Sequence, residues 1–217
     1  MIQVAIVDDH QIVRTGFREL LSEDSAIRVS FEAANGDDAL AQLRTHECDV
    51  LLLDISLPGK SGVDVLRAVR QRYPELKVLI LSAFPEESYA LAMLKNGASG
   101  YLCKDCDGEE VLRAIRTVYA GRRYVSARAA ELLADEMSGE RNVAPHVGLS
   151  DRELQVFLRL ARGESVSAIA ERLHLSVKTI STYRSRLTEK LNIMSNAGLA
   201  TYALRHGLID GSAPESE

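Results

Sequence analysis

The sequence of 217 residues is 46% hydrophobic and 26% charged, and it has a formal net charge of −5 at pH 7. A chain of this length can form two domains that each bury a core. It contains no run approaching the ~20 apolar residues of a membrane-spanning helix, and its N-terminus does not resemble a signal peptide. Three cysteines, an odd number, fit a reducing compartment. We therefore expect a cytoplasmic protein that does not act at a membrane.

Charge is divided unevenly along the chain. Residues 1–120 contain 13 Lys and Arg against 19 Asp and Glu, a net charge of −6, whereas residues 146–208 contain 9 against 5, a net charge of +4. An acidic N-terminal part would repel DNA but suits a metal site, and a basic C-terminal part suits contact with a polyanion. The charges therefore predict different partners for the two parts.

Residues 1–120 alternate between short apolar runs and amphipathic segments. The runs are typical of buried parallel strands and lie at Gln3–Val7, Ile27–Ala33, Val50–Asp54, Lys77–Ser82 and Gly100–Cys103. Helical patterns occur near 11–21, 36–45, 62–72, 86–96 and 107–119, and Asp107 with Glu110 can form a capping box for the last of them. This alternation predicts an α/β domain at 1–120, built on a doubly wound five-stranded parallel sheet.

The pattern changes after residue 120. Residues 121–145 are predicted to be a linker with a short helix, Ala127–Met137, followed by Ser, Gly, Asn and Pro without periodicity. Residues 146–210 are predicted to form a small all-α domain, and residues 211–217 a disordered tail.

Four helices are expected in the C-terminal domain. Ser150 and Glu153 form a capping box for the first, which stops at Gly163. The others are expected at Val166–Leu173, at Val177–Leu191 after the cap Ser176, and from Ser195 to Gly207. A short helix followed by a tight turn and a long polar-faced helix predicts a helix-turn-helix.

Polar residues end or follow the apolar runs of the N-terminal part. Asp8 and Asp9 follow the first run, Asp54 ends the third, Ser82 ends the fourth and Lys104 follows the fifth. The carboxyl ends of parallel strands meet at one edge of the sheet, where ligands bind. Neighbouring buried carboxylates need a neutralising cation, and an oxygen-rich cluster suits Mg²⁺. The sequence therefore predicts a magnesium site with a hydroxyl and an ammonium group beside it.

These residues, with Tyr101 and the segment LPGKSG after Asp54, resemble the receiver domain of bacterial two-component response regulators. The spacings match: 45 residues from Asp9 to Asp54, and 19 and 22 residues from Ser82 to Tyr101 and Lys104. The C-terminal part resembles the helix-turn-helix of the NarL/LuxR (FixJ) class, and the segments IVRTGFREL and TYRSRLTEKL look most like the GacA/UvrY branch of global regulators. One departure is Asp105 after Lys104, where many receivers have proline.

The resemblance implies a role for each site residue. A sensor histidine kinase would donate a phosphoryl group to Asp54, the nucleophile. Asp9, Asp54 and the backbone carbonyl of Ser56 would hold Mg²⁺, with Asp8 acting through a water. Lys104 would pair with the phosphoryl oxygens. Ser82 and Tyr101 would form the switch: the Ser82 hydroxyl moves toward the phosphoryl group, and the tyrosine ring fills the space that opens.

The segment Val177–Leu191 is expected to enter the major groove of DNA. Its apolar residues Ile180, Leu187 and Leu191 have the spacing of a face packed on the core. By resemblance, Ser181, Thr182 and Ser185 would contact bases, and the phosphate contacts would be Lys178, Thr179, Arg184, Arg186 and Lys190. The family uses the segment corresponding to Asn196–His206 for dimer contacts, which implies a homodimer on double-stranded promoter DNA.

Other interpretations are open at this point. A phosphatase of the haloacid-dehalogenase type also uses an aspartate at a strand end, but it needs a second carboxylate where Ser56 stands and has no need of a helix-turn-helix, so we predict that the protein is not an enzyme. A DNA-binding module with a vestigial receiver is a further possibility. Cys103 and Cys106 form a C-x-x-C motif that could be a redox pair, although a core position and a loop position are the simpler interpretation.

Overall fold

The computed structural model describes residues 1–83, 86–126, 129–131 and 145–209. Its N-terminal domain is built on five parallel strands in the order β2-β1-β3-β4-β5. The strands are β1 (Ile2–Val7), β2 (Ile27–Ala33), β3 (Val50–Asp54), β4 (Lys77–Ser82) and β5 (Gly100–Cys103). All five predicted strands are thus confirmed, with β1 one residue longer at its start. The chain goes from β1 outward to β2, then crosses to the other side of β1 to form β3 and continues to β4 and β5. Strands β1 and β3 are therefore neighbours in the interior of the sheet.

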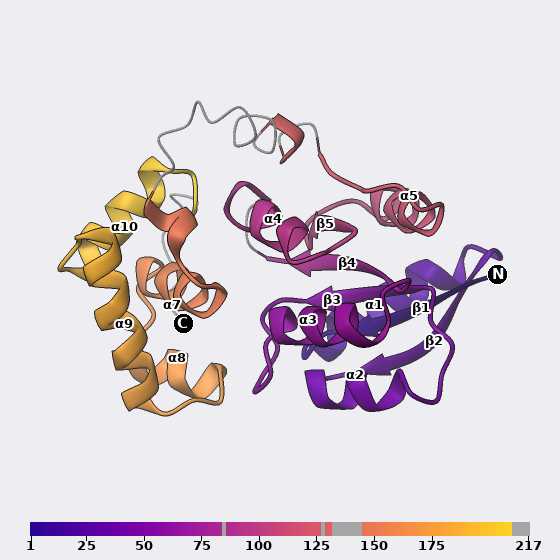
Figure 1. Ribbon diagram of the computed structural model, residues 1–217, viewed down its shortest axis with the longest axis horizontal. Helices are drawn as coiled ribbons and strands as arrows, with labels where there is room; N and C mark the ends of the chain where they lie inside the picture. The colour runs from indigo at the N-terminus through magenta and orange to yellow at the C-terminus, as the bar shows by residue number, and fades with distance from the viewer. Residues whose placement is uncertain (84–85, 127–128, 132–144, 210–217) are drawn as a thin grey trace.

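Helices cover both faces of this sheet (Figure 1). On one face, α1 (Gln11–Ser22) and α5 (Gly108–Tyr119) enclose a core with residues such as Val4, Ile6 and Ile115. On the other, α2 (Gly36–Gln42), α3 (Gly62–Arg72) and α4 (Glu86–Lys95) pack over a core that includes Val7 and Leu53. The predicted doubly wound α/β domain is confirmed. All five residues of β3 are buried, including Asp54 at its end.

Two helix ends differ from the prediction. The helix α2 ends at Gln42 instead of near residue 45, because the next amides turn to carbonyls three residues back, with Thr45 N–H donating to the Gln42 carbonyl at 3.0 Å. At α5, Asp107 accepts from the Glu110 amide as expected, but the Glu110 carboxylate accepts from the Tyr124 hydroxyl at 2.8 Å and does not close the capping box. A long-range partner has replaced the local one.

The β3–α3 connection folds back tightly over the end of β3. Ser61 and Asp64 form a complete capping box that starts α3. A Cβ atom at Gly62 would lie 2.1 Å from the Asp54 carbonyl oxygen, so only glycine permits this approach. The Gly62 amide donates to the Ile55 carbonyl at 3.1 Å. The connection is therefore anchored next to Asp54.

The C-terminal domain is all-helical, as predicted. Its elements are the 3₁₀ turn η1 (Pro145–Gly148) and the helices α7 (Asp151–Ala161), α8 (Val166–Arg172), α9 (Val177–Leu191) and α10 (Asn196–Arg205). The predicted capping box of Ser150 and Glu153 is present, and Asn192 ends α9 in the left-handed conformation with φ of 55°. The predicted helix-turn-helix is confirmed as α8, a turn, and α9.

Most of the predicted helix Ala127–Met137 and the tail 211–217 lie outside the described residues, although 129–131 are helical. Among the residues that are described, no helix is long and apolar enough to cross a membrane.

Candidate functional site

The carboxyl ends of β1, β3 and β5 bring the predicted acidic residues and lysine together. Asp8 and Asp54 are 0% and 1% exposed, and Asp9 beside them is partly exposed. The Lys104 ammonium lies 2.9 Å from Asp54 Oδ2 and 2.5 Å from Asp8 Oδ2. The lysine therefore bridges the two carboxylates that sequence reasoning placed at this edge.

Burial and neighbouring charges shift the pKa of both partners. Burial raises the pKa of Asp54 and outweighs the opposing effect of Lys104, and the Asp8 carboxylate adds to the rise. Burial alone would lower the pKa of Lys104, but Asp54 and Asp8 raise it above its ordinary value. The pocket thus holds more negative charge than a single ammonium neutralises.

The donor atoms in the pocket suit a small divalent cation. Ligand atoms of Asp8, Asp9, His10 and Asp54 all lie within 4.8 Å of one another. Two ligands on opposite sides of an octahedral Mg²⁺ ion are about 4.2 Å apart, since each lies at about 2.1 Å. The Ser56 amide donates to Asp54 Oδ1 at 3.1 Å, so the backbone after β3 borders the same space. The residues present therefore fit the predicted magnesium ion.

Ser82 and Tyr101 lie on the neighbouring strands β4 and β5. The Ser82 side chain is fully buried, and its backbone carbonyl accepts from the Lys104 amide at 2.8 Å. Tyr101 pairs with Ile80 in the sheet and is 1% exposed. The tyrosine ring therefore already occupies a buried position in this structure.

Cys106 of the C-x-x-C motif lies in an environment that disfavours the thiolate. Cys103 and Cys106 are free and half-buried. Burial, with a further contribution from Glu110, raises the pKa of the Cys106 thiol to about 11. Because the thiolate is the reactive form, this environment favours an inert cysteine.

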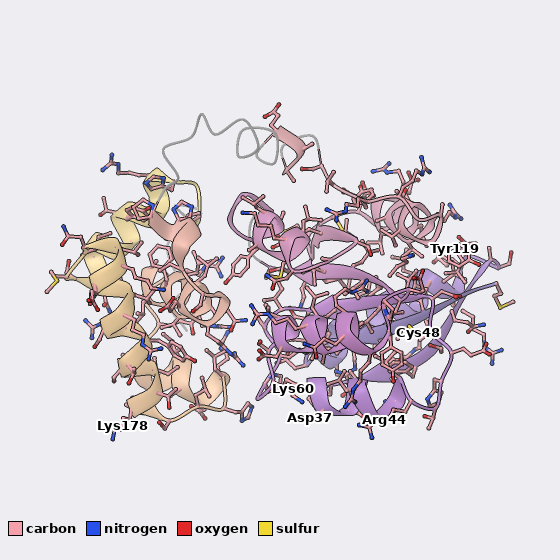
Figure 2. All side chains as sticks on the ribbon, in the orientation of Figure 1. Asp37, Arg44, Cys48, Lys60, Tyr119 and Lys178 are labelled. Atoms are coloured by element: carbon pink, nitrogen blue, oxygen red, sulfur yellow. The ribbon has the colours of Figure 1, made fainter. Side chains whose placement is uncertain are left out.

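The helix α9 presents most of the predicted DNA contacts to solvent. Lys178, Ser181, Thr182, Ser185 and Arg186 are exposed, and Lys178 lies at the outer, N-terminal end of the helix (Figure 2). Thr179 and Arg184 are half-buried. The opposite face is packed on the domain core through Ile180, Leu187 and Leu191. This division matches the one expected from the spacing of the apolar residues.

Lys190 lies at the other end of α9 in a different environment. Its ammonium is 2.7 Å from Glu153 Oε2, the carboxylate that closes the α7 capping box with Ser150. Burial opposes ionisation of Glu153, but the hydrogen bonds from Lys190 and Ser150 lower its pKa overall. In this arrangement Lys190 holds α9 to the start of α7.

The two domains contact each other directly, which sequence reasoning did not predict. The buried side-chain amide of Gln155 on α7 donates to the Ile55 carbonyl at 3.0 Å, and Arg152 donates to the Gly59 carbonyl at 2.6 Å. Both carbonyls belong to the β3–α3 connection that begins after Asp54. Recognition of backbone atoms leaves no side-chain signal in the N-terminal domain, so only the structure reveals these contacts.

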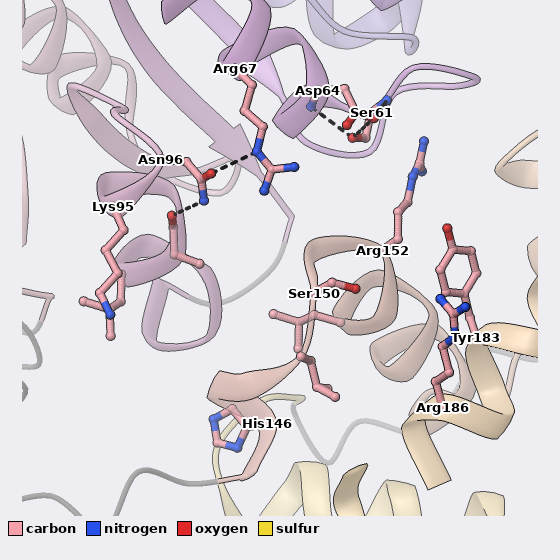
Figure 3. Close-up of a pocket in the computed structure, with 14 residues that line it drawn as sticks. Ser61, Asp64, Arg67, Lys95, Asn96, His146, Ser150, Arg152, Tyr183 and Arg186 are labelled. Carbon is pink, nitrogen blue, oxygen red and sulfur yellow. Dashed lines mark hydrogen bonds between the residues drawn. The ribbon is translucent and has the colours of Figure 1, made fainter. Parts of the chain in front are cut away.

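A cleft of about 440 Å³ lies beside these contacts. Figure 3 shows Arg152 extending from α7 toward the segment that carries Ser61, while Tyr183 and Arg186 approach from α9. The flank of α9 that bears Tyr183 and Arg186 therefore faces the N-terminal domain.

A buried acidic site at the carboxyl edge of a parallel sheet, joined to a helix-turn-helix, defines the class of two-domain regulators in which an α/β domain accompanies a DNA-binding domain. The response regulator receiver domain model matches residues 4–116, and the model of bacterial regulatory proteins of the luxR family matches residues 147–203. The chain therefore belongs to the response regulators that carry a luxR-type DNA-binding domain, a family of transcription regulators.

Two relatives that match along nearly the whole of both chains support this assignment. The chain is 38% identical to the response regulator UvrY of Escherichia coli (strain K12) over 218 residues, covering 100% of both chains. It is 37% identical to the response regulator GacA of Pseudomonas aeruginosa over 214 residues, covering 98% of this chain and 100% of the relative. The resemblance to the GacA/UvrY branch is confirmed.

The structure of this chain is also similar to the solved structures of two regulators. RcsB from Salmonella enterica serovar Typhimurium, bound to a promoter in the presence of the phosphomimetic BeF₃⁻, has a TM-score of 0.68 and 25% identity, covering 94% of this chain and 98% of that one. ChrA, of a haem-sensing two-component system, has a TM-score of 0.52 and 30% identity, covering 96% and 98%.

Proposed function

We propose that this protein is a transcription regulator that a sensor histidine kinase switches by phosphorylating Asp54. The observation that carries the proposal is the Lys104 ammonium 2.9 Å from Asp54 in a buried acidic pocket. A buried aspartate needs such a partner, and the same ammonium is placed to neutralise oxygens transferred onto Asp54. The exposed polar face of α9 in the same chain supplies the output.

The chemistry is a phosphoryl transfer between two side chains. A carboxylate oxygen of Asp54 attacks the phosphorus of the kinase phosphohistidine, the nitrogen–phosphorus bond breaks, and an acyl phosphate forms. Asp9, Asp54 and the Ser56 carbonyl would hold Mg²⁺, with Asp8 acting through a water. The ion supplies positive charge that stabilises the transferred group. Lys104 exchanges its contact with the Asp54 carboxylate for one with the phosphoryl oxygens.

The phosphoryl group then acts on the residues around it. Its oxygens attract the Ser82 hydroxyl on β4, and Tyr101 on β5 adjusts its packing in response. The β3–α3 connection, which follows Asp54 directly, also has to accommodate the added group. Because Gln155 and Arg152 bind backbone carbonyls of this connection, its rearrangement weakens the contact between the domains.

The DNA-binding domain acts as a homodimer on double-stranded promoter DNA, a function that places the protein in the cytoplasm. Ser181, Thr182 and Ser185 contact bases, and Lys178, Arg184 and Arg186 contact phosphates, whereas Lys190 holds α9 to Glu153 at the start of α7. In the docked arrangement the base-contacting side chains are already exposed. We therefore assign to phosphorylation the release of the α9 flank at Tyr183 and Arg186 and the freedom of α10 to pair with a second copy.

Binding to DNA with and without phosphorylation tests this function. Duplexes are first selected from a randomised library with the acetyl phosphate-treated protein. The affinity for the selected duplex is then measured by fluorescence anisotropy for the wild type and for Asp54→Asn, each with Mg²⁺ and with or without acetyl phosphate. We expect the treated wild type alone to bind at least about tenfold more tightly, which is about 1.4 kcal/mol. Equal affinity of the phosphorylated and unphosphorylated wild type would exclude the switch.

A further inference from the structure

His10 stands at the edge of the acidic pocket in a position that helix capping does not explain. It is the N-cap residue of α1, where Ser, Thr, Asp or Asn is favoured, and its side chain makes no capping hydrogen bond. The imidazole is directed at the pocket instead. Its Nδ1 atom lies 2.8 Å from Asp9 Oδ1 and 3.2 Å from Asp8 Oδ1.

The backbone holds the ring in this direction. The His10 amide donates to Asp8 Oδ1 at 2.8 Å, and Arg14, one turn further along α1, donates to the Asp8 carbonyl at 2.7 Å. The start of α1 is thus fixed against the end of β1. The His10 side chain is 62% exposed, so its outer edge meets solvent while Nδ1 faces the carboxylates.

We propose that His10 is a direct nitrogen ligand of the ion bound by Asp9 and Asp54, and that it shifts the preference of the pocket from Mg²⁺ toward a transition ion such as Co²⁺. The inference rests on the metal site of the proposed function. The His10 nitrogen belongs to the group of ligand atoms that lie within 4.8 Å of one another. One ion with ligands at 2.0–2.2 Å can reach atoms up to about 4.4 Å apart, so a small closure of the pocket is sufficient.

The chemical reason for the shift is the type of ligand. Carboxylate and carbonyl oxygens suit Mg²⁺, which keeps several waters, whereas a neutral imidazole binds Co²⁺ and other transition ions more strongly. Nδ1 faces carboxylate oxygens at 2.8 and 3.2 Å and carries a hydrogen there, so the ion would bind the other tautomer, in which the hydrogen is on Nε2. The oxygens of Asp9 and Asp54 would remain ligands for either kind of metal.

The test compares metal binding by the full-length wild type, His10→Gln and Asp54→Ala. Affinities for Co²⁺ and Mg²⁺ are measured by isothermal titration calorimetry, and the Mn²⁺ complex is examined by pulsed electron paramagnetic resonance for coupling to ¹⁴N. His46→Gln, a change of an exposed histidine outside the pocket, is the matched control. Far-ultraviolet circular dichroism verifies that each variant is folded.

We expect ¹⁴N coupling in the wild type and in His46→Gln but not in His10→Gln. We also expect His10→Gln to lower Co²⁺ affinity by about tenfold or more while Mg²⁺ affinity changes much less. If Mn²⁺ binds in the wild type without ¹⁴N coupling, and His10→Gln leaves the Co²⁺ to Mg²⁺ ratio unchanged, the proposal is wrong and the metal site stands. If no metal binds the wild type, or Asp54→Ala binds it equally well, both the ligand role and the metal site of the proposed function fail.

Discussion

The side-chain amide of Gln155 donates a hydrogen bond of 3.0 Å to the backbone carbonyl of Ile55, which follows Asp54 in the sequence. The Ile55 carbonyl also accepts from the Gly62 amide, and the Gln155 side-chain oxygen accepts from Arg152 at 2.9 Å. Every polar atom of the contact thus has a partner, and the contact is buried. It links the segment that directly follows β3 to α7, the first helix of the C-terminal domain.

Replacing Gln155 by glutamate should therefore undock the domains. Gln155→Glu keeps the shape of the side chain but directs a carboxylate at a carbonyl, and leaving such a buried group unsatisfied costs about 1–3 kcal/mol. We expect a larger radius of gyration by small-angle X-ray scattering and tighter binding of unphosphorylated protein to the selected duplex. Gln71→Glu, at an exposed position on α3, is the control. Unchanged scattering and affinity in Gln155→Glu would show that this contact does not hold the domains.

Lys178 and Lys190 lie on the same helix but should respond differently to truncation. Lys178→Ala should weaken binding to all duplexes and reduce the slope of log affinity against log salt by about one, because one phosphate contact is lost. Lys190→Ala should instead destabilise the domain by about 1 kcal/mol, because Glu153 loses its cation. Affinity across a salt series and thermal denaturation separate the two effects. The assignment is reversed if Lys190→Ala changes the salt slope and leaves the melting temperature unaltered.

Removing the bridging ammonium should make the pocket dependent on metal. In Lys104→Ala, Asp8 and Asp54 face each other without a cation, which we expect to cost roughly 3 kcal/mol at neutral pH without metal. The pKa of Asp54 is already raised in the folded protein, so the folded state binds more protons than the unfolded chain and stability falls as pH rises. The loss should therefore be smaller at pH 5 than at pH 8, and added Mg²⁺ should stabilise the variant more than the wild type. Urea denaturation at the two pH values measures this, and equal losses at both would contradict it.

His146 should make the C-terminal domain sensitive to acid. Burial, with a contribution from His206, lowers the pKa of His146 from 6.5 to about 4. Between these values the unfolded chain binds a proton that the folded protein does not, so stability falls as pH decreases from 6.5 to 4. The loss should be on the order of 3 kcal/mol, because each unit of pKa difference corresponds to about 1.4 kcal/mol. His146→Phe should remove this part of the pH dependence, and the difference between the two denaturation curves isolates it from the carboxylates. Parallel curves would contradict the assignment.

The acidic site could be predicted from sequence because its residues follow runs whose structure is locally determined. A buried parallel strand requires continuous apolar residues, and the residue after it necessarily lies at the carboxyl edge of the sheet. The places of Asp9, Asp54 and Lys104 in the site could therefore be predicted from the apolar runs that precede or contain them. The helix-turn-helix was found in the same way, from caps such as Ser176 and from the apolar face of α9.

Contacts between distant polar residues could not be predicted. The bonds from Gln155 to Ile55 and from Lys190 to Glu153 depend on how separate elements pack, and nothing in the periodicity encodes them. The predicted capping box of Glu110 is absent for the same reason, because its carboxylate accepts a hydrogen bond from the Tyr124 hydroxyl instead. Polar side chains form whichever satisfied pair the fold brings together, so their partners emerge only from the structure.

The most direct test of the account is the mass of the intact protein after incubation with acetyl phosphate and Mg²⁺, compared between the wild type and Asp54→Asn, with peptide mapping of the product. We predict that the wild type gains one phosphoryl group, located in the peptide containing Asp54, and that Asp54→Asn gains none. Equal gain by both proteins, or no gain by the wild type with either acetyl phosphate or phosphoramidate, would contradict the assignment of Asp54 as the phosphoacceptor.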